Sequence, residues 1–248
     1  MLAILSLTAT SVNAQLIGRV RKEIISDSAT GDQVITHIAD GGGWSTSITL
    51  NNLDANTPAT VTILFWGDSG NQQAFPFVGM GLANYVTGTI PPMGQATVQT
   101  ANIYKSTTTG SAFINTTGHV GGFAVFGYVT GQEAVVPIEA ANDQKFILAF
   151  DNTNGHVMGI ALANPHANLV TANVAFLDEN GGVILSDRLT MPANSHTSFI
   201  LTDRYPGLAG VMGTALFTTD SPANGIAGLG IRANSAGAYT TVFALALP

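Results

Sequence analysis

The sequence contains no cysteine, which excludes disulfide frameworks, zinc–thiolate sites and cysteine nucleophiles. Charged residues are also few, at 9% compared with about 25% in an average soluble domain. Only 8 residues are basic, and their one cluster, Arg19, Arg21 and Lys22, is too small for the basic stripe that nucleic-acid binding needs. No apolar run reaches the length of about 18 residues that indicates a membrane span. We therefore expect no nucleic-acid partner, no transmembrane span and no cofactor.

The residues that are abundant indicate an all-β protein. Hydrophobic residues make up 46% of the chain, which is enough for a folded core and argues against disorder. The apolar runs are short and lie between clusters of Gly, Asn and Pro, the residues that supply turn conformations. Short strands separated by such turns are typical of sandwiches and barrels.

The chain also repeats itself. Residues 34–52 consist of an apolar strand, an acidic Gly-rich turn, a second apolar strand and a final Asn, and residues 146–164 follow the same pattern. Such a repeat decides how many units a chain contains. We predict an internal duplication that gives two tandem antiparallel β-sandwich units of immunoglobulin-like architecture, near residues 33–141 and 142–248. A single barrel is less favoured, because each unit has enough strands for its own core.

The turn-forming clusters of Gly, Asn and Pro divide unit one into nine predicted strands. These are residues 33–39, 44–51, 59–66, 73–78, 85–90, 95–100, 111–115, 122–129 and 134–138. Unit two repeats the order but is shorter in the region that matches residues 73–90.

Because side chains alternate across a strand, positions that are apolar in both units should face the two cores. Phe65 pairs in this way with Phe176, and Leu50 with Leu162.

The N-terminus has the features of a secreted protein. Residues 1–14 are apolar and end in small residues before Gln15, which favours a signal peptide over a buried first strand. The usual basic segment at its start is missing. Residues 15–32 alternate weakly and are predicted to be an N-terminal arm or an edge strand.

Two motifs are reminiscent of catalytic or metal chemistry. Residues 67–70, Gly-Asp-Ser-Gly, copy a serine-protease nucleophile motif, but the only preceding histidine is His37, and unit two has a plain turn in the matching place. We assign Ser69 to a turn and expect no enzymatic activity. The run Asp151, Asn152 and Asn154 gives a weak candidate for a calcium-like site, with an Asx-stabilised turn as the alternative.

The five histidines show no spacing of metal ligands. We predict that His166 and His196 are solvated side chains in loops.

Aromatic side chains provide the candidate ligand site. Trp66, Tyr85, Tyr104 and Tyr128 could form a strip on which a polysaccharide stacks, and the alternative is that they are ordinary sheet aromatics. Trp66 has the opposite parity to Phe65 and precedes a turn, so we expect it to be exposed. Trp44 shares the parity of the core and is expected to cap it.

Four segments carry a resemblance to a known module. They are residues 38–44, 150–155, 162–165 and 203–206. Together they resemble a duplicated sandwich of unassigned function in secreted proteins of environmental bacteria, especially acidobacteria. The resemblance implies a secreted location and a fold, and it carries over no functional residue.

These observations favour a secreted, non-enzymatic structural or adhesive protein at the cell surface or outside, with a carbohydrate-binding module as the alternative and a hydrolase third. The final segment, residues 239–247, has strand composition and no charge. It should pair within unit two, cover the joint between the units, or meet another chain. Self-association or binding to another surface protein through an edge strand is therefore expected as a partner mode.

Overall fold

The computed structural model describes residues 15–19, 33–140, 144–220 and 225–247. The predicted signal peptide, residues 1–14, and the part of the predicted arm from residue 20 to residue 32 lie outside these ranges. The described chain is all-β with antiparallel sheets, as predicted. Its helical segments are α1 (Leu201–Arg204) and the 3-10 helix η1 (Pro206–Leu208). No helix in the described ranges is long and apolar enough to cross a membrane.

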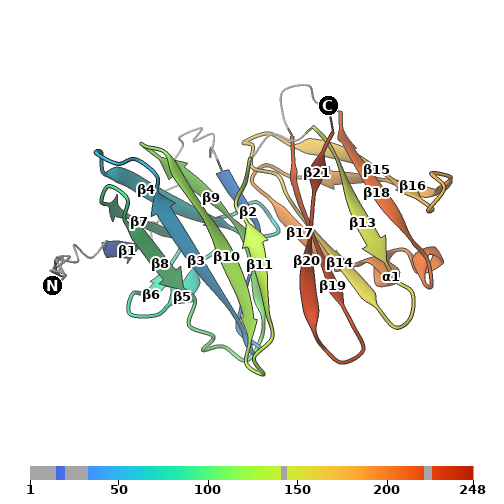
Figure 1. The fold of residues 1–248 in the computed structure, drawn as a ribbon, viewed down its shortest axis with the longest axis horizontal. Helices are drawn as coiled ribbons and strands as arrows, with labels where there is room; N and C mark the ends of the chain where they lie inside the picture. Colours follow the sequence, from blue (N-terminus) through green and yellow to red (C-terminus); the bar gives the residue numbers. More distant parts are fainter. Residues whose placement is uncertain (1–14, 20–32, 141–143, 221–224, 248) are drawn as a thin grey trace, which may run out of the picture.

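The first half of the chain forms a sandwich-like pair of sheets, drawn in blue to green in Figure 1. One sheet has the strand order β1-β7-β4-β9-β2-β12, the other has the order β11-β10-β3-β8, and a small hairpin, β5-β6, accompanies them. The bounds are β1 (Gln15–Arg19), β2 (Gln33–Asp40), β3 (Trp44–Asn52), β4 (Ala59–Trp66), β5 (Phe75–Phe77), β6 (Gly81–Ala83), β7 (Tyr85–Ile90), β8 (Gln95–Gln99), β9 (Thr108–Thr116), β10 (Val120–Tyr128), β11 (Glu133–Pro137) and β12 (Glu139–Ala140).

The second half forms another pair of sheets, drawn in yellow to red in Figure 1. Their strand orders are β16-β15-β18-β13-β21 and β17-β14-β19-β20. The bounds are β13 (Lys145–Asp151), β14 (Val157–Ala163), β15 (Val170–Leu177), β16 (Val183–Met191), β17 (His196–Ile200), β18 (Met212–Thr219), β19 (Ala227–Ala233), β20 (Tyr239–Phe243) and β21 (Leu245–Ala246).

The two sandwiches have the same strand order. The run β7-β4-β9-β2-β12 matches β16-β15-β18-β13-β21, and β11-β10-β3-β8 matches β20-β19-β14-β17. In both, the chain leaves one sheet after its penultimate strand and ends with a two-residue strand in the other. In the described ranges, β1, β5 and β6 have no counterpart in the second sandwich. The absence of β5 and β6 agrees with the shorter region predicted opposite residues 73–90, although β7 in that region has a counterpart in β16.

The register of the core positions is also the same. Phe65 lies opposite Ala112 on the neighbouring strand, and Phe176 lies opposite Ala215. Both Phe side chains are fully buried, each in the core of its own sandwich. Leu50 and Leu162 are likewise buried, and each lies opposite a glycine. The predicted core positions are therefore confirmed.

The first and the last strands of the described chain pair within their own sandwiches. The first strand, β1, adds to the edge strand β7. The C-terminal segment pairs with β19 through β20 and with β13 through β21, so it closes both sheets of the second sandwich. Its first residue, Tyr239, also packs against the first core, so the segment covers the joint as well.

The two sandwiches are joined by a packed apolar contact. The outer face of the first six-stranded sheet supplies Val34, Leu64, Trp66 and Phe113, and the second sandwich supplies alanines from β14 and β19. Strand β2 contacts β14, β17 and β19, while β11 lies beside β20 (Figure 1). The outer face of the β2–β9–β4 region is therefore buried, although a sheet of an isolated sandwich would expose it.

Candidate functional site

A cleft of about 690 Å³ opens at the joint between the sandwiches. The wall from the first sandwich carries aromatic and hydroxyl or amide side chains, among them Trp44, Thr107, Tyr128 and Gln132. The wall from the second is mainly aliphatic. Its aliphatic residues include Val157, Ile160, Ile200 and Ile231, and it also carries Phe199 and Tyr239. None of the described residues that line the cleft is Asp, Glu, Lys or Arg. Clefts of this size and character are the usual sites for small ligands.

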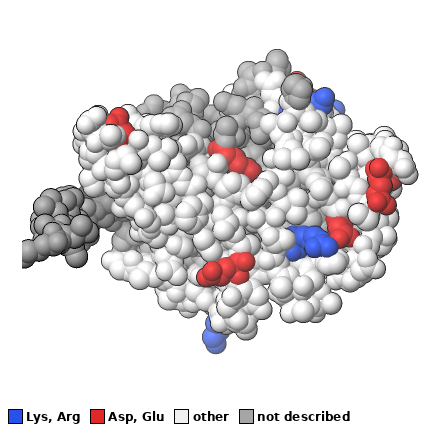
Figure 2. Space-filling model, viewed as in Figure 1, with Lys and Arg blue, Asp and Glu red and all other residues white. Residues whose placement is uncertain are grey.

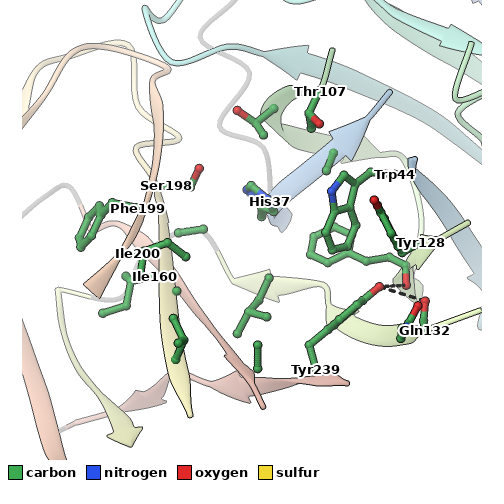
Figure 3. A pocket seen from close by; sticks show the side chains of 18 of the residues that line it. His37, Trp44, Thr107, Tyr128, Gln132, Ile160, Ser198, Phe199, Ile200 and Tyr239 are labelled. Atoms are coloured by element: carbon green, nitrogen blue, oxygen red, sulfur yellow. Dashed lines mark hydrogen bonds between the residues drawn. The ribbon is translucent and has the colours of Figure 1, made fainter. Parts of the chain in front are cut away.

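Three aromatic rings gather at one side of the cleft (Figure 3). The ring of Trp44 lies 4.8 Å from that of Tyr128 and 5.3 Å from that of Tyr239, between centroids. The Tyr239 hydroxyl donates a hydrogen bond of 3.0 Å to the carbonyl of Gln132, which ties the two sandwiches together. Burial, and next the charge of Glu133, raises the pKa of Tyr239 to about 12, so its phenol stays neutral. This side of the cleft is aromatic and uncharged.

The triple glycine makes room for this cluster. Gly43 follows β2 in a turn with φ +98°, which a side chain rarely adopts. A Cβ atom there would lie 2.6 Å from Cε2 of Tyr128. The Tyr128 ring can therefore lie against the backbone beside Trp44 only because residue 43 is glycine. Trp44 is half-buried, and instead of capping the first core as predicted it faces the joint.

A chain of hydrogen bonds begins at the exposed side chain of Asp68, passes through the buried His196 and ends at the cleft. The Asp68 carboxylate lies 2.7 Å from Nδ1 of His196, and Nε2 of His196 lies 2.8 Å from Nδ1 of His37. The side chain of His196 is completely buried, and His37, which lines the cleft, is 9% exposed. This series of hydrogen bonds runs from Asp68 in the first sandwich to His196 in the second and back to His37 in the first. In Figure 3, His37 lies between the aromatic and aliphatic walls.

The charge state of His37 follows from its surroundings. Burial lowers the pKa of His37 well below its usual value, and the neighbouring His196 lowers it further. The ring also meets Phe126 edge-on, with centroids 5.2 Å apart. His37 is therefore neutral around pH 7, and the cleft keeps its lack of charge.

Strand β2 aims His37 by means of a bulge. Ile35 lies opposite Ala112 and Ile38 opposite Gly110, so β2 contains one residue more than β9 over this stretch. In a regular strand, Ile35 and Ile38 would point to opposite faces, because they are three positions apart. The extra residue lets both side chains point into the first core. Bulges re-aim side chains and occur often beside functional sites.

The Gly67–Gly70 turn holds Asp68 in place. Gly70 has φ +77°, and a Cβ atom there would lie 2.1 Å from the Ala193 carbonyl oxygen. The turn thus lies directly on the second sandwich, against the segment that precedes His196 at the start of β17. Ser69, the predicted turn residue, accepts a hydrogen bond from Asn71 at the exposed side. The Gly-Asp-Ser-Gly motif forms a turn in the structure, and the carboxylate of Asp68 is the group of this turn that reaches His196.

The expectation that Trp66 is exposed is wrong. Its side chain is 9% exposed and packs against Phe113, 5.9 Å between ring centroids, within the joint. The predicted face of the strand was correct, because Trp66 does point away from the core that holds Phe65. The second sandwich covers that outer face, which pattern alone cannot show. Trp66 is therefore unavailable for stacking on a polysaccharide.

The other predicted aromatics do not form one strip. Tyr85 packs beside Trp66 at the joint, Tyr104 is 48% exposed in the loop before β9, and Tyr128 lines the cleft. Of the predicted ligand-binding residues, the structure places Tyr128 alone in the cleft. Trp44 and Tyr239, which complete its cluster, lie 84 and 111 residues from Tyr128 in the sequence, so no local pattern linked the three rings.

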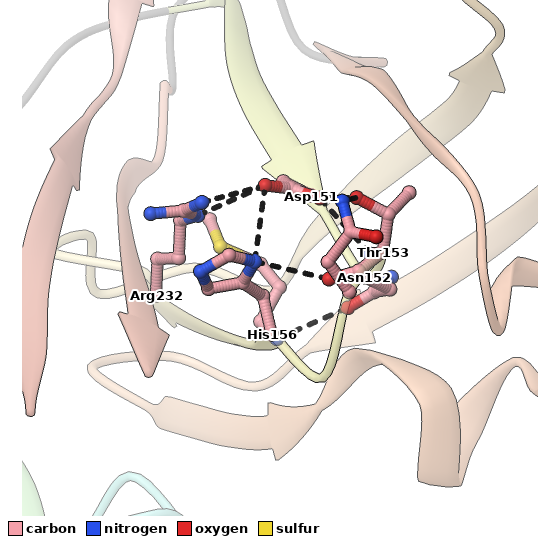
Figure 4. A network of polar contacts seen from close by, with 7 residues as sticks. Asp151, Asn152, Thr153, His156 and Arg232 are labelled. Carbon is pink, nitrogen blue, oxygen red and sulfur yellow. Dashed lines mark hydrogen bonds and ion pairs between the residues drawn. The ribbon is translucent and has the colours of Figure 1, made fainter. Parts of the chain in front are cut away.

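The candidate metal residues belong to a network of hydrogen bonds and ion pairs between side chains and backbone (Figure 4). Asp151 accepts hydrogen bonds from the backbone and hydroxyl of Thr153 and from Arg232, whose Nη2 lies 2.7 Å away. Thr153 first and Arg232 next lower the pKa of Asp151 well below its usual range. Among the described residues, no group of three or more acidic, His or Cys side chains could hold a metal ion.

The neighbouring amides serve the fold. Asn152 bonds the Leu208 carbonyl and the Met158 amide, and Asn154 sits in the turn with φ 51°. The alternative reading, an Asx-stabilised turn, describes residues 151–154. An arginine occupies the place where a metal site would need a cation.

The prediction for His196 is also wrong. It begins β17 instead of lying in a loop, and it is buried instead of solvated. Its partners are 128 and 159 residues away in sequence, so no local pattern could have found them.

Comparisons with protein-family models, with curated proteins and with solved structures find no match for the chain.

Proposed function

We propose that this protein is a secreted, non-enzymatic binding protein with an adhesive or structural role, and that the cleft between its sandwiches takes up an uncharged ligand. The observation that carries the proposal is the character of the cleft: about 690 Å³, lined by aromatic, aliphatic and hydroxyl side chains, with no formal charge among the described lining residues. A charged ligand would lose its hydration there without gaining a partner. An uncharged ligand loses little and buries apolar surface.

The location of the cleft also supports binding. Its walls come from two folded sandwiches that are held together by the apolar contact around Trp66 and by the Tyr239 hydrogen bond. Such a site is formed before the ligand arrives, which reduces the entropy lost on binding. Adhesion to a surface polymer or to a partner needs a preformed site of this kind.

A neutral fluorescent probe tests the cleft directly. We expect 1-N-phenylnaphthylamine to bind with enhanced fluorescence. Ile200 lines the cleft and is 41% exposed, so Ile200→Asp introduces a charge without burying it in a core. This change should weaken probe binding about tenfold or more.

The matched control is Val183→Asp, on an edge strand outside the cleft, where the side chain is 65% exposed. It should bind the probe like the unchanged protein. Absence of probe binding to the unchanged protein, or equal weakening by both variants, would contradict the proposal.

A carbohydrate ligand is the second candidate, favoured by the cluster of Trp44, Tyr128 and Tyr239. Sugar rings stack on aromatic faces, and Thr107 and Gln132 offer hydrogen bonds nearby. The chain has 2 tryptophans, so Trp66→Phe leaves Trp44 as the sole reporter. Neutral oligosaccharides should quench its fluorescence. No response across a broad panel would contradict the proposal of a carbohydrate ligand, and it would not affect the proposal of an uncharged ligand that the apolar probe tests.

We infer that the sandwiches arose by internal duplication of one immunoglobulin-like unit. Beyond the shared strand order, a buried asparagine lies at the end of the same strand in each: Asn52 ends β3, and Asn164 directly follows β14. Asn52 donates to the carbonyls of Thr57, Ile90 and Pro91, and Asn164 donates to those of Asn168, Met191 and Pro192. The side-chain oxygen of each accepts from the backbone amide two residues later. Identical bonding of equivalent residues supports a common origin.

Self-association through an edge strand remains a proposal for the partner mode. The exposed apolar residues Phe243 and Leu245 lie in the terminal strands, and the described surface carries few charges, as Figure 2 shows for one face. Light scattering over a range of concentrations tests it, and a monomer at every concentration would exclude it.

A further inference from the structure

We propose that His37 is a fixed hydrogen-bond acceptor in the cleft, and that the ligand is an uncharged amphiphile which places a hydroxyl group on Nε2 of this residue. This inference rests on the proposed function of the cleft. It goes further by assigning one specificity-determining atom and the chemical class of the ligand.

The direction of the hydrogen-bond chain fixes which nitrogen of each ring carries hydrogen. The carboxylate of Asp68 can only accept, so Nδ1 of His196 donates to it at 2.7 Å. With the His196 ring neutral, its other nitrogen accepts, so Nε2 of His196 receives the hydrogen of Nδ1 of His37 at 2.8 Å. Nε2 of His37 is left without a hydrogen. It is therefore an acceptor.

That nitrogen is the part of the ring still free to meet a ligand. Nδ1 of His37 is engaged by His196, and in the described part of the chain no other hydrogen bond to the ring is present. His37 lines the cleft and retains a small exposed area, 9%. The bulge in β2 positions His37, and the Gly67–Gly70 turn positions Asp68, at the two ends of the hydrogen-bond chain. The acceptor is therefore fixed before a ligand binds.

The surroundings make this single acceptor selective. The ring faces Phe126, and Ile160 and Ala161 belong to the opposite wall. A hydrogen bond is stronger in such a low-dielectric place, and an acceptor that a ligand covers without bonding loses its hydration with no return. A ligand with a hydroxyl should therefore be preferred over the same ligand with that oxygen methylated.

The aliphatic wall defines the rest of the ligand. Val157, Ile200 and Ile231 offer apolar surface and no hydrogen bond from their side chains. A ligand that satisfies both features combines an apolar chain or ring with a hydroxyl group. The aromatic cluster on the other side accommodates a planar ring.

A pair of probes that differ in one hydrogen-bond donor tests the inference. We expect 4-butylphenol to bind about tenfold more tightly than 4-butylanisole, measured by calorimetry or by displacement of 1-N-phenylnaphthylamine. His37→Phe should remove this preference and leave the binding of 4-butylanisole unchanged. Asp68→Ala, which removes a side chain that is 64% exposed, should reduce the preference without disturbing a core, and it serves if His37→Phe does not fold.

An independent measurement needs no variant. Long-range ¹H–¹⁵N correlation spectra report which ring nitrogen of each histidine carries hydrogen, and we expect His37 to carry it on Nδ1 around pH 7. On addition of 4-butylphenol the Nε2 resonance of His37 should shift. The anisole should not shift it in the same way.

The outcomes separate the two proposals. Equal binding of both probes, or hydrogen on Nε2 of His37, overturns the acceptor role and leaves the cleft as a binding site. Absence of binding by both probes and by 1-N-phenylnaphthylamine overturns the proposed function itself. A preference for the phenol that persists in both His37→Phe and Asp68→Ala also overturns the acceptor role.

Discussion

Phe65 and Phe176 occupy the same place in the two sandwiches, but different segments complete the core around them. In the first sandwich the hairpin β5–β6 inserts Phe75 and Phe77, whose rings lie 5.8 and 5.0 Å from that of Phe65. In the second, the helical segment between β17 and β18 places Tyr205 4.8 Å from Phe176. The strand order is shared, while the segments that pack against these two phenylalanines are not.

The comparison teaches where a repeated sandwich tolerates change. The inserted segments come from different connections, one after β4 and the other after β17. Both pack large side chains against the equivalent phenylalanines, because an unfilled space in a close-packed core is costly. Leu201 and Leu208, both fully buried, extend the filling of the second core.

The largest expected effect comes from emptying these cores. Phe65→Ala and Phe176→Ala should each lower the free energy of unfolding by about 3–5 kcal/mol, because both side chains are fully buried. Urea denaturation followed by circular dichroism measures the loss. A large loss for one and less than about 1 kcal/mol for the other would break the equivalence of the two positions.

The matched asparagines give the next effect. Asn52→Ala and Asn164→Ala should each cost about 2–3 kcal/mol, because buried carbonyl oxygens lose their donor. Asn173→Ala is a control, since that Asn is bonded at the exposed side of β15. Denaturation of the three variants sharpens the comparison, and a small loss at only one of the buried sites would count against it.

The two sandwiches should also differ in their response to acid. The folded pKa of His37 is below its unfolded value of 6.5, so the unfolded chain binds the proton more readily. The free energy of unfolding should be constant above pH 6.5 on this account and fall below it, by up to about 1.4 kcal/mol per pH unit. His37→Gln, which can still donate to His196, should flatten this part of the profile. An unchanged slope between pH 6.5 and 5 in that variant would contradict it.

The smallest effect concerns Asp151 in the second sandwich. Its folded pKa is below the ordinary value of 3.8, so its contribution is complete above that pH and is lost as the pH falls below it. Asp151→Asn should cost about 1 kcal/mol at pH 7, since the pair with Arg232 is partly solvated. The difference between variant and unchanged protein should disappear at low pH, and a difference that persists there would contradict the assignment.

Much of the framework was readable from the sequence. Residues 59–66 and 85–90 are strands with the predicted bounds, β4 and β7. The predicted strand at 73–78 is the shorter β5, and that at 111–115 is the longer β9. These elements follow from local rules, because alternation and turn residues act over a few positions. The repeat then indicated which positions share a role.

The sequence by itself determined the strands, their alternation and the pairing of core positions, because these depend on neighbours along the chain and on burial of apolar side chains. Only the tertiary structure decided what the outward faces do. Trp66 points outward as its parity requires, but docking of the second sandwich buries it. Asp68, His196 and His37 meet across that joint from positions 128 and 159 residues apart. Contacts between two folded faces depend on the shape of both, and no period in the sequence records them.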